Sequence, residues 1–373
     1  MSSKKVVFSN KQQAEFIKEL RQRVNQYFQD NNISRYGNWN MYIKSAFMIC
    51  LYFIPLAILV SGSVQSTGWM FFWWMLTGFG MSGIGLSIMH DANHGSYSKH
   101  KWVNQTMGWL VNFLGAYHVN WKIQHNVLHH SFTNVHEHDH DLETAAMRFS
   151  PNQERKKLYK YQAFYAPFIY GLMTIYWLVS KDFIQVFQYN KENLLASQNL
   201  NLRKAMTHLV ISKLAYVGLV LVLPIIMIDL PWYQILLGFF VMQFSCGLML
   251  ALIFQTAHVI EETDFFKTNE NGELENNWAI HQLKTTANFA DKSKFFSWFI
   301  GGLNYQVEHH LFPNICHVHY KKISKIVKAT ANEFQLPYYQ HRTFLGALKS
   351  HFSLLHKLGT GKYDQQMIPV DKK

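Results

Sequence analysis

The chain has 373 residues, 20 histidines and a formal net charge of +12, and aromatic side chains make up 16% of it. Such a charge suits an anionic partner, either lipid headgroups, a CoA moiety or nucleic acid. Nucleic acid is disfavoured because no zinc-finger, helix-turn-helix or RNA-binding motif is present. The three cysteines are scattered and two lie in apolar runs, which argues against a disulfide framework and fits a reducing environment.

The first 44 residues are polar and basic. Phe16, Leu20, Val24 and Phe28 recur at four-residue steps, which predicts an amphipathic helix over residues 12–28, packed on the protein or on a membrane surface. No early apolar stretch follows the basic start, so no cleaved signal peptide is expected. We expect residues 1–44 to form a cytosolic amphipathic segment.

Long apolar runs predict a membrane domain over residues 45–258. A bilayer core takes about 20 helical residues, and the predicted spans are about 45–61, 69–89, 209–228 and 232–251. The turns between paired spans lack Lys and Arg, so the positive-inside rule places both termini in the cytosol. Lys213 is the exception to the low charge of these helices, and we expect it near a cytosolic end. The expected fold is all-α, with four transmembrane helices and a cytosolic helical cap that carries the histidine clusters and includes residues 259–373.

Two central segments do not fit the span pattern. The mixture of apolar and polar residues over 95–124 predicts an amphipathic helix. Residues 161–180 are uncharged and long enough to cross, but a crossing would leave the histidines before and after it on opposite faces. We therefore expect this segment to lie in the interface or to re-enter the membrane.

Three histidine clusters follow helical spacing, since residues three and four apart share one helical face. Neutral imidazole suits iron, zinc, copper and nickel, and such ions take about six ligands at most. Seven histidines and a glutamine exceed one ion, so two metals are implied. The competing interpretation is that they are ordinary surface or core histidines. The clusters comprise His90 and His94, then His125, His129 and His130, then Gln306, His309 and His310.

Two runs carry a family resemblance. HNVLHHSFTN, from His125 to Asn134, and NYQVEHHLFP, from Asn304 to Pro313, resemble histidine boxes of the integral-membrane fatty acid desaturases, a di-iron family. Gln306 in the first position of the third box resembles the front-end branch, which includes Δ5, Δ6, Δ8 and linoleoyl-CoA desaturase-like enzymes. There is no His-Pro-Gly-Gly motif, so no fused cytochrome-b5-type domain is expected.

The resemblance implies a cis double bond placed in a CoA- or lipid-linked acyl chain, between an existing double bond and the carboxyl end. It implies two irons, O2 as co-substrate, and electrons from an external cytochrome b5 or ferredoxin-type donor with an NAD(P)H reductase. It also implies a buried apolar tunnel for the chain, and a location in the endoplasmic reticulum or a bacterial inner membrane.

The same resemblance adds His258 to the predicted ligands, because stearoyl-CoA-type enzymes carry an additional histidine on the corresponding helix. Those enzymes have an asparagine one turn earlier, where this chain has Phe254 followed by Gln255. Gln306 is expected to be a weak or indirect ligand. The predicted metal ligands are therefore His90, His94, His125, His129, His130, His258, His309, His310 and, weakly, Gln306.

Other histidines are expected to have no part in the site. The segment His136–Asp141 alternates histidine and carboxylate, which favours a solvated loop over metal ligation, and His317 and His319 are expected at the surface. Two alternatives to a desaturase stay open: a related histidine-box lipid hydroxylase or monooxygenase, and a membrane metal-binding or transport protein. A transporter would place ionisable ligands near the bilayer midplane.

Overall fold

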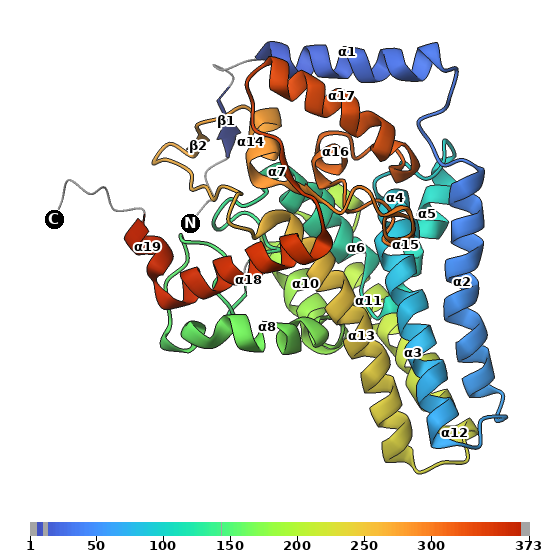
Figure 1. The fold of residues 1–373 in the computed structure, drawn as a ribbon. Coiled ribbons are helices and arrows are strands. Elements are labelled where there is room, and N and C mark those ends of the chain that lie inside the picture. The colour runs from blue at the N-terminus through green and yellow to red at the C-terminus, as the bar shows by residue number, and fades with distance from the viewer. Residues whose placement is uncertain (1–5, 10–13, 143, 367–373) are drawn as a thin grey trace.

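The structure is a computed structural model that describes residues 6–9, 14–142 and 144–366. It confirms an all-α membrane architecture, since four helical segments of the described chain are long and apolar enough to cross a bilayer (Figure 1). The predicted spans are found, with somewhat different ends. The segments are α2 (Trp39–Val60); α3 (Thr67–Gly83) continued by η1 (Ile84–Ile88) and α4 (Met89–Asn93); α11 (Leu202–Val217) continued by η7 (Gly218–Val222) and α12 (Leu223–Met227); and α13 (Trp232–His258).

Glycines on α3 let its neighbours approach closely. A Cβ on Gly80 would lie 2.4 Å from the backbone nitrogen of Tyr52 on α2, and one on Gly78 would lie 2.9 Å from the carbonyl oxygen of Met242 on α13. Small residues at helix interfaces are typical of membrane bundles. The close packing fixes the position of α4, the end of this helical segment, which carries His90 and His94.

The segment predicted to be interfacial or re-entrant forms a bent pair of helices. Residues Lys157–Gly171 and Met173–Lys191 meet at 61°, and α8 crosses α13 beside α18 (Figure 1). Whether the pair lies in the interface or spans the membrane stays a prediction. Its elements are η4 (Lys157–Tyr161), α8 (Gln162–Gly171), α9 (Met173–Tyr176), η5 (Trp177–Lys181) and α10 (Asp182–Lys191).

Lys213, which we expect near a cytosolic end, is paired inside the protein. Its side chain is buried on α11, and its Nζ donates to Asp182 Oδ2 at 2.5 Å and to the carbonyl oxygen of Trp177 at 2.9 Å. A buried ammonium is tolerated only when it is paired and hydrogen-bonded. Lys213 therefore fastens η5 and the start of α10 to α11.

Residues 95–124 do not form the single amphipathic helix that we predicted. Gly115 has a left-handed backbone with φ of 79°, which ends the first helical stretch. The region contains α5 (Lys101–Trp109), the 3-10 helix η2 (Leu110–Leu114), α6 (His118–Trp121) and the first residues of the π-helix η3 (Lys122–His129).

The cap joins both ends of the described chain. The amphipathic prediction is confirmed in α1 (Ala14–Asp30), whose Phe16, Leu20 and Val24 are buried against α17 (Tyr320–Glu333); residues 12 and 13 lie outside the described residues. The strands are two or three residues long and pair in parallel, β1 (Val7–Phe8) with β2 (Glu273–Leu274) and β3 (Ala287–Phe289) with β4 (Tyr339–His341). The remaining helices are α7 (His130–Phe132), η6 (Leu195–Gln198), α14 (Trp278–Thr285), α15 (Lys294–Phe299), α16 (Gln306–Leu311), η8 (His317–His319), α18 (Phe344–Thr360) and α19 (Lys362–Gln366).

Candidate metal centre

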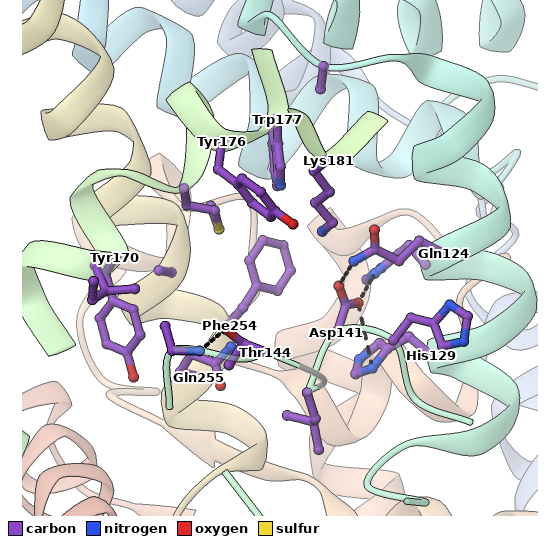
Figure 2. Close-up of a pocket in the computed structure, with 18 of the residues that line it drawn as sticks. Gln124, His129, Asp141, Thr144, Tyr170, Tyr176, Trp177, Lys181, Phe254 and Gln255 are labelled. Carbon is purple, nitrogen blue, oxygen red and sulfur yellow. Dashed lines mark hydrogen bonds and ion pairs between the residues drawn. The ribbon is translucent and has the colours of Figure 1, made fainter. Parts of the chain in front are cut away.

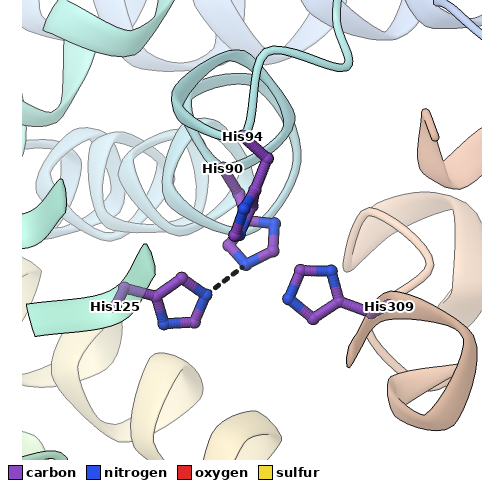
Figure 3. Close-up of side chains that lie close together, drawn as sticks. All are labelled: His90, His94, His125 and His309. Atoms are coloured by element: carbon purple, nitrogen blue, oxygen red, sulfur yellow. Dashed lines mark hydrogen bonds between the residues drawn. The ribbon is translucent and has the colours of Figure 1, made fainter. Parts of the chain in front are cut away.

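Four histidines from three separate helices converge at the end of α4. One nitrogen from each of His90, His94, His125 and His309 lies within 4.8 Å of the others, and we call these residues the first group. Figure 3 shows His90 and His94 descending from one helix while His125 and His309 enter from opposite sides. Such convergence of nitrogens from α4, η3 and α16 is the arrangement expected of a metal site.

Three more histidines form a second group next to the first. His129, His258 and His310 have ligand nitrogens within 4.8 Å of one another, and all three side chains are buried. His130 lies between the groups, because its Nε2 is 2.9 Å from Nε2 of His309 while its ring stacks on His310 at 4.4 Å between centroids. The structure thus brings together all eight histidines that were predicted as ligands.

Neighbouring histidines on η3 face the same way but belong to different groups. We expected His125 and His129 to share one face of an α-helix, and their rings do stack at 5.3 Å between centroids. The segment is π-helical, however, which is a form of helix found at functional sites. His125 therefore joins the first group and His129 the second, so the pair connects the two groups.

Several Nε2 atoms of these rings face one another or have no hydrogen-bond partner. Nε2 of His90 and Nε2 of His125 are 3.1 Å apart, and Nε2 of His130 is 3.3 Å from that of His125. Facing lone pairs repel unless a proton or a cation lies between them. In the described part of the chain, the buried Nε2 atoms of His94, His258 and His310 also have no hydrogen-bond partner. These residues fit two metal ions.

Burial keeps most of these rings in the neutral protonation state that metals require. It lowers the pKa of His130, His309 and His310 well below the usual range of histidine, and neighbouring imidazoles lower it further. Neutral imidazole is the ligand form. Burial alone would also lower the pKa of His129, but the carboxylates of Asp139 and Asp141 together outweigh it, and the pKa is raised.

Each ring of the second group is oriented through its other nitrogen. Nδ1 of His129 lies 3.1 Å from both carboxylate oxygens of Asp139, Nδ1 of His258 is 3.1 Å from the carbonyl oxygen of Thr285, and Nδ1 of His310 is 2.8 Å from Oε1 of Gln282. Because these partners accept, each Nδ1 carries the proton and Nε2 presents its lone pair. Acceptors of this kind usually fix metal-binding histidines.

The loop His136–Asp141 is not the solvated loop that we predicted. Asp139 is 1% exposed and also accepts a hydrogen bond from the backbone nitrogen of Asn134 at 2.9 Å. Asp141 is hydrogen-bonded to Gln124, and its carboxylate is 3.7 Å from Nδ1 of His125 and from Nδ1 of His129. The loop therefore contributes carboxylates that surround the histidines, and backbone bends at Asn134 and Glu137, both with positive φ, direct them inward.

His317 and His319 are buried, which contradicts the prediction that they lie at the surface. Nδ1 of His317 is 2.8 Å from Oδ2 of Asp91, and its Nε2 is 2.5 Å from Nζ of Lys44. His319 contacts the carbonyl oxygen of Tyr36 at 3.1 Å. Helix α2 and the chain before it cover both rings, which spacing within residues 317–319 could not reveal.

Two residues at which the chain departs from the family pattern are buried beside the histidines. The Phe254 ring is 6.2 Å from His90 and 6.0 Å from His125 between centroids, so the side chain at this place is apolar. Gln306 is 1% exposed at the start of α16, and its Nε2 has no partner among the described residues. Its role as a weak or indirect ligand stays a prediction.

A cavity of about 530 Å³ borders the histidines. Figure 2 shows Tyr170 on one side, His129, Asp141 and Gln124 on the other, and Phe254 between them. Aromatic and aliphatic side chains from the bent helix pair, from α13 and from the loop before η4 form most of its apolar wall. These include Met147, Phe149, Ile169, Tyr170, Leu172, Met173, Tyr176, Trp177, Ala251 and Phe254.

The fold and this site define an integral-membrane protein with a buried histidine cluster beside an apolar cavity. The sequence matches the family described as "Fatty acid desaturase" over residues 67–342. The chain belongs to the fatty acid desaturase family, as its histidine boxes indicated. It is therefore an oxidoreductase, and neither a lipid hydroxylase nor a metal transporter is favoured.

Curated relatives are similar along nearly the whole chain. An sn-1 linoleoyl-lipid 6-desaturase of Arthrospira platensis is 35% identical over 92% of this chain and 92% of its own length. Another sn-1 linoleoyl-lipid 6-desaturase, from Synechocystis sp., is 32% identical over 96% of this chain and 99% of its own length. An acyl-lipid (8-3)-desaturase of Physcomitrium patens is 35% identical over 95% of this chain and 74% of its own. These relatives support the front-end branch.

Proposed function

We propose that the protein places a cis double bond in a lipid-linked acyl chain, between the carboxyl end and a double bond already present. The observation that carries the proposal is the position of the cavity, which combines a long apolar wall with an edge formed by His125, His129 and His258. An acyl chain in this cavity would lie alongside both groups of histidines. The names of the relatives, which specify lipid-linked substrates, favour a lipid over CoA as carrier.

The residues that would hold two irons are the eight histidines. His90, His94, His125 and His309 would bind one ion and His129, His258 and His310 the other, with His130 between them. When bound, the iron pair supplies the O2-dependent oxidation that removes hydrogen from an unactivated methylene pair, which amino-acid side chains cannot perform alone. O2 accepts two electrons from an external cytochrome b5 or ferredoxin-type donor and two from the substrate, and water is the product.

The residues of this chain orient the imidazoles, position the acyl chain and exclude water from the site. Asp139, Gln282 and the carbonyl group of Thr285 hold the imidazoles in one tautomer and one orientation. Phe254 and Trp177 exclude water from the space between the histidines and the acyl chain. Holding the reacting carbons in place matters because a small displacement is costly in rate.

We also propose that the four spans leave both termini in the cytosol and that the bent pair does not cross. All the ligands must meet on one side, so an even number of crossings must separate His130 from His309. Single cysteines at the exposed residues Lys156 and Asn190, in a chain with Cys50 replaced by serine, should both be labelled only from the cytosolic side. Labelling from opposite sides would mean that the pair crosses.

The function is tested by fatty acid profiling of a host that expresses the protein and is fed defined acids. We expect a new double bond on the carboxyl side of an existing one, with the product recovered in membrane lipids. A His310→Ala variant is the matched negative control. A hydroxylated product, or a new double bond only on the methyl side, would contradict the proposal.

A further inference from the structure

One side of the cavity is polar, and Lys181 is its cation. The polar end consists of Tyr117, Gln124, Asp141, Lys181, Asp182 and Gln185. Figure 2 shows Lys181 directed from η5 toward Gln124 and Asp141, on the same side as His129 and away from Tyr170. The polar end therefore adjoins the histidine edge, and the apolar wall extends away from both.

The two carboxylates of the polar end are already engaged. Oδ2 of Asp182 accepts from Lys213 at 2.5 Å, and its Oδ1 lies 3.2 Å from Nδ2 of Asn120. Asp141 is hydrogen-bonded to Gln124 and faces Nδ1 of His125 and of His129. Neither carboxylate forms an ion pair with Lys181.

The ammonium of Lys181 consequently keeps unused donors. Among the described residues it forms no hydrogen bond: its Nζ lies 5.5 Å from the centroid of the Trp177 ring, and Asp141 and Asp182 attract it only through their charge. A cation over an aromatic face is held in position without using its N–H groups. Since Lys213 also fixes the backbone of Trp177, the amino group has a defined place in the cavity wall.

A second polar group at this end also lacks a partner. The hydroxyl oxygen of Tyr117 is buried, lines the cavity and has no hydrogen bond in the described part of the chain. Burying a polar group without a partner costs about 1–3 kcal/mol. Two polar side chains with unused hydrogen-bonding capacity beside an apolar cavity indicate an oxygen-bearing ligand group.

We propose that Lys181 binds the carbonyl oxygen of the acyl ester or thioester and so sets the carbon pair that lies against the histidines. This inference rests on the proposed function and deepens it. An enzyme that counts carbons from the carboxyl end must hold that end, only a few carbons from the reacting pair. Lys181 meets this need because it lies on the same side of the cavity as His129, while the methyl end extends along the wall that Tyr170 forms.

The test uses the purified enzyme with linoleoyl-phosphatidylcholine in liposomes and with linoleoyl-CoA, together with a reconstituted electron donor. Lys181→Met keeps most of the length of the side chain and removes the donors, and Lys181→Arg keeps the cation. Lys191→Met on the exposed face of α10 is the control. KM, kcat, iron content and the position of the new double bond are measured for each.

We expect Lys181→Met to raise KM on the order of tenfold or more and to spread the new double bond over neighbouring carbon pairs, at unchanged iron content. Both substrates should be affected because both carry the carbonyl group. Lys181→Arg should restore most of the selectivity, and Lys191→Met should match the parent enzyme. Should Lys181→Met not accumulate, Lys181→Gln serves as the second variant under the same criteria.

A Lys181→Met enzyme with parental KM and one product would overturn the inference. A variant that loses iron, or only kcat, while the double bond stays in one place would also overturn it. That result would mean that Lys181 supports the structure and does not position the substrate. Failure of the parent enzyme to desaturate either substrate on the carboxyl side would instead contradict the proposed function.

Discussion

The two groups of histidines are held in place by different means. In the second group every Nδ1 meets an acceptor, namely Asp139, Gln282 or the carbonyl group of Thr285. In the first group Asp141 lies 3.7 Å from Nδ1 of His125 and the hydroxyl of Tyr320 lies 3.2 Å from Nδ1 of His309, whereas the buried Nδ1 of His90 has no partner in the described chain. The first group therefore depends more on the close packing of α3 and α4. The comparison predicts that the two proposed metal positions differ in affinity for iron, and we expect the second group to bind it more tightly.

Replacing a ligand of the second group should have the largest effect. His310→Ala removes a ligand and leaves His130 without its stacked neighbour, so activity should fall below detection and iron should drop to about half of the parental content. Measuring iron and product formation together checks this. His341→Ala, at a partly exposed histidine outside both groups, is the control. Full iron content in His310→Ala would show that the second group is not a metal position.

Removing an outer acceptor should have a smaller effect. Asp139→Asn keeps the size of a buried side chain but loses the negative charge that faces Nδ1 of His129, so iron affinity should fall about 10- to 100-fold. Competition with a graded chelator measures this change. Glu137→Gln, on an exposed side chain of the same loop, should leave affinity unchanged. Equal iron retention in the two variants would remove the basis for ranking the groups.

Gln306 tests whether the first group needs a further ligand. Gln306→Ala should lower activity while much of the iron remains, because the predicted role is weak or indirect ligation. Gln306→His should be tolerated better than alanine if geometry alone matters. Activity and iron content of both variants decide the matter. Loss of both irons in either one would show that Gln306 supports the structure instead.

The sequence predicted the features that depend on local pattern. Apolar runs predicted the four long helices, and the four-residue spacing predicted the buried face of α1. The histidine boxes were recognisable because each is a short continuous run. Where the chain departs from simple α-helical spacing, as in the π-helix η3, the pattern indicated the right residues and the face that His125 and His129 share, but not their division between the two groups.

Distant contacts explain what the sequence did not reveal. Gln282 orients His310, and Asp139 turns inward partly because Nδ2 of Asn134 donates to the carbonyl oxygen of His258 at 2.9 Å, across more than a hundred residues. His317 is buried because its two ring nitrogens contact Lys44 and Asp91, which come from distant helices. No spacing within one segment contains such information, because each case depends on which helices pack together.

The smallest effect is expected at the one outer contact of His309. Tyr320 is 1% exposed, and its hydroxyl shares a neutral hydrogen bond with Nδ1 of His309, which contributes about 0.5–1.5 kcal/mol. Tyr320→Phe should therefore weaken iron binding by less than about tenfold, clearly less than Asp139→Asn, with the protein still folded because the ring remains in place. The same chelator competition measures both variants. If Tyr320→Phe lost more iron than Asp139→Asn, the first group would be the one that depends on its outer contacts, and the ranking of the two metal positions would be reversed.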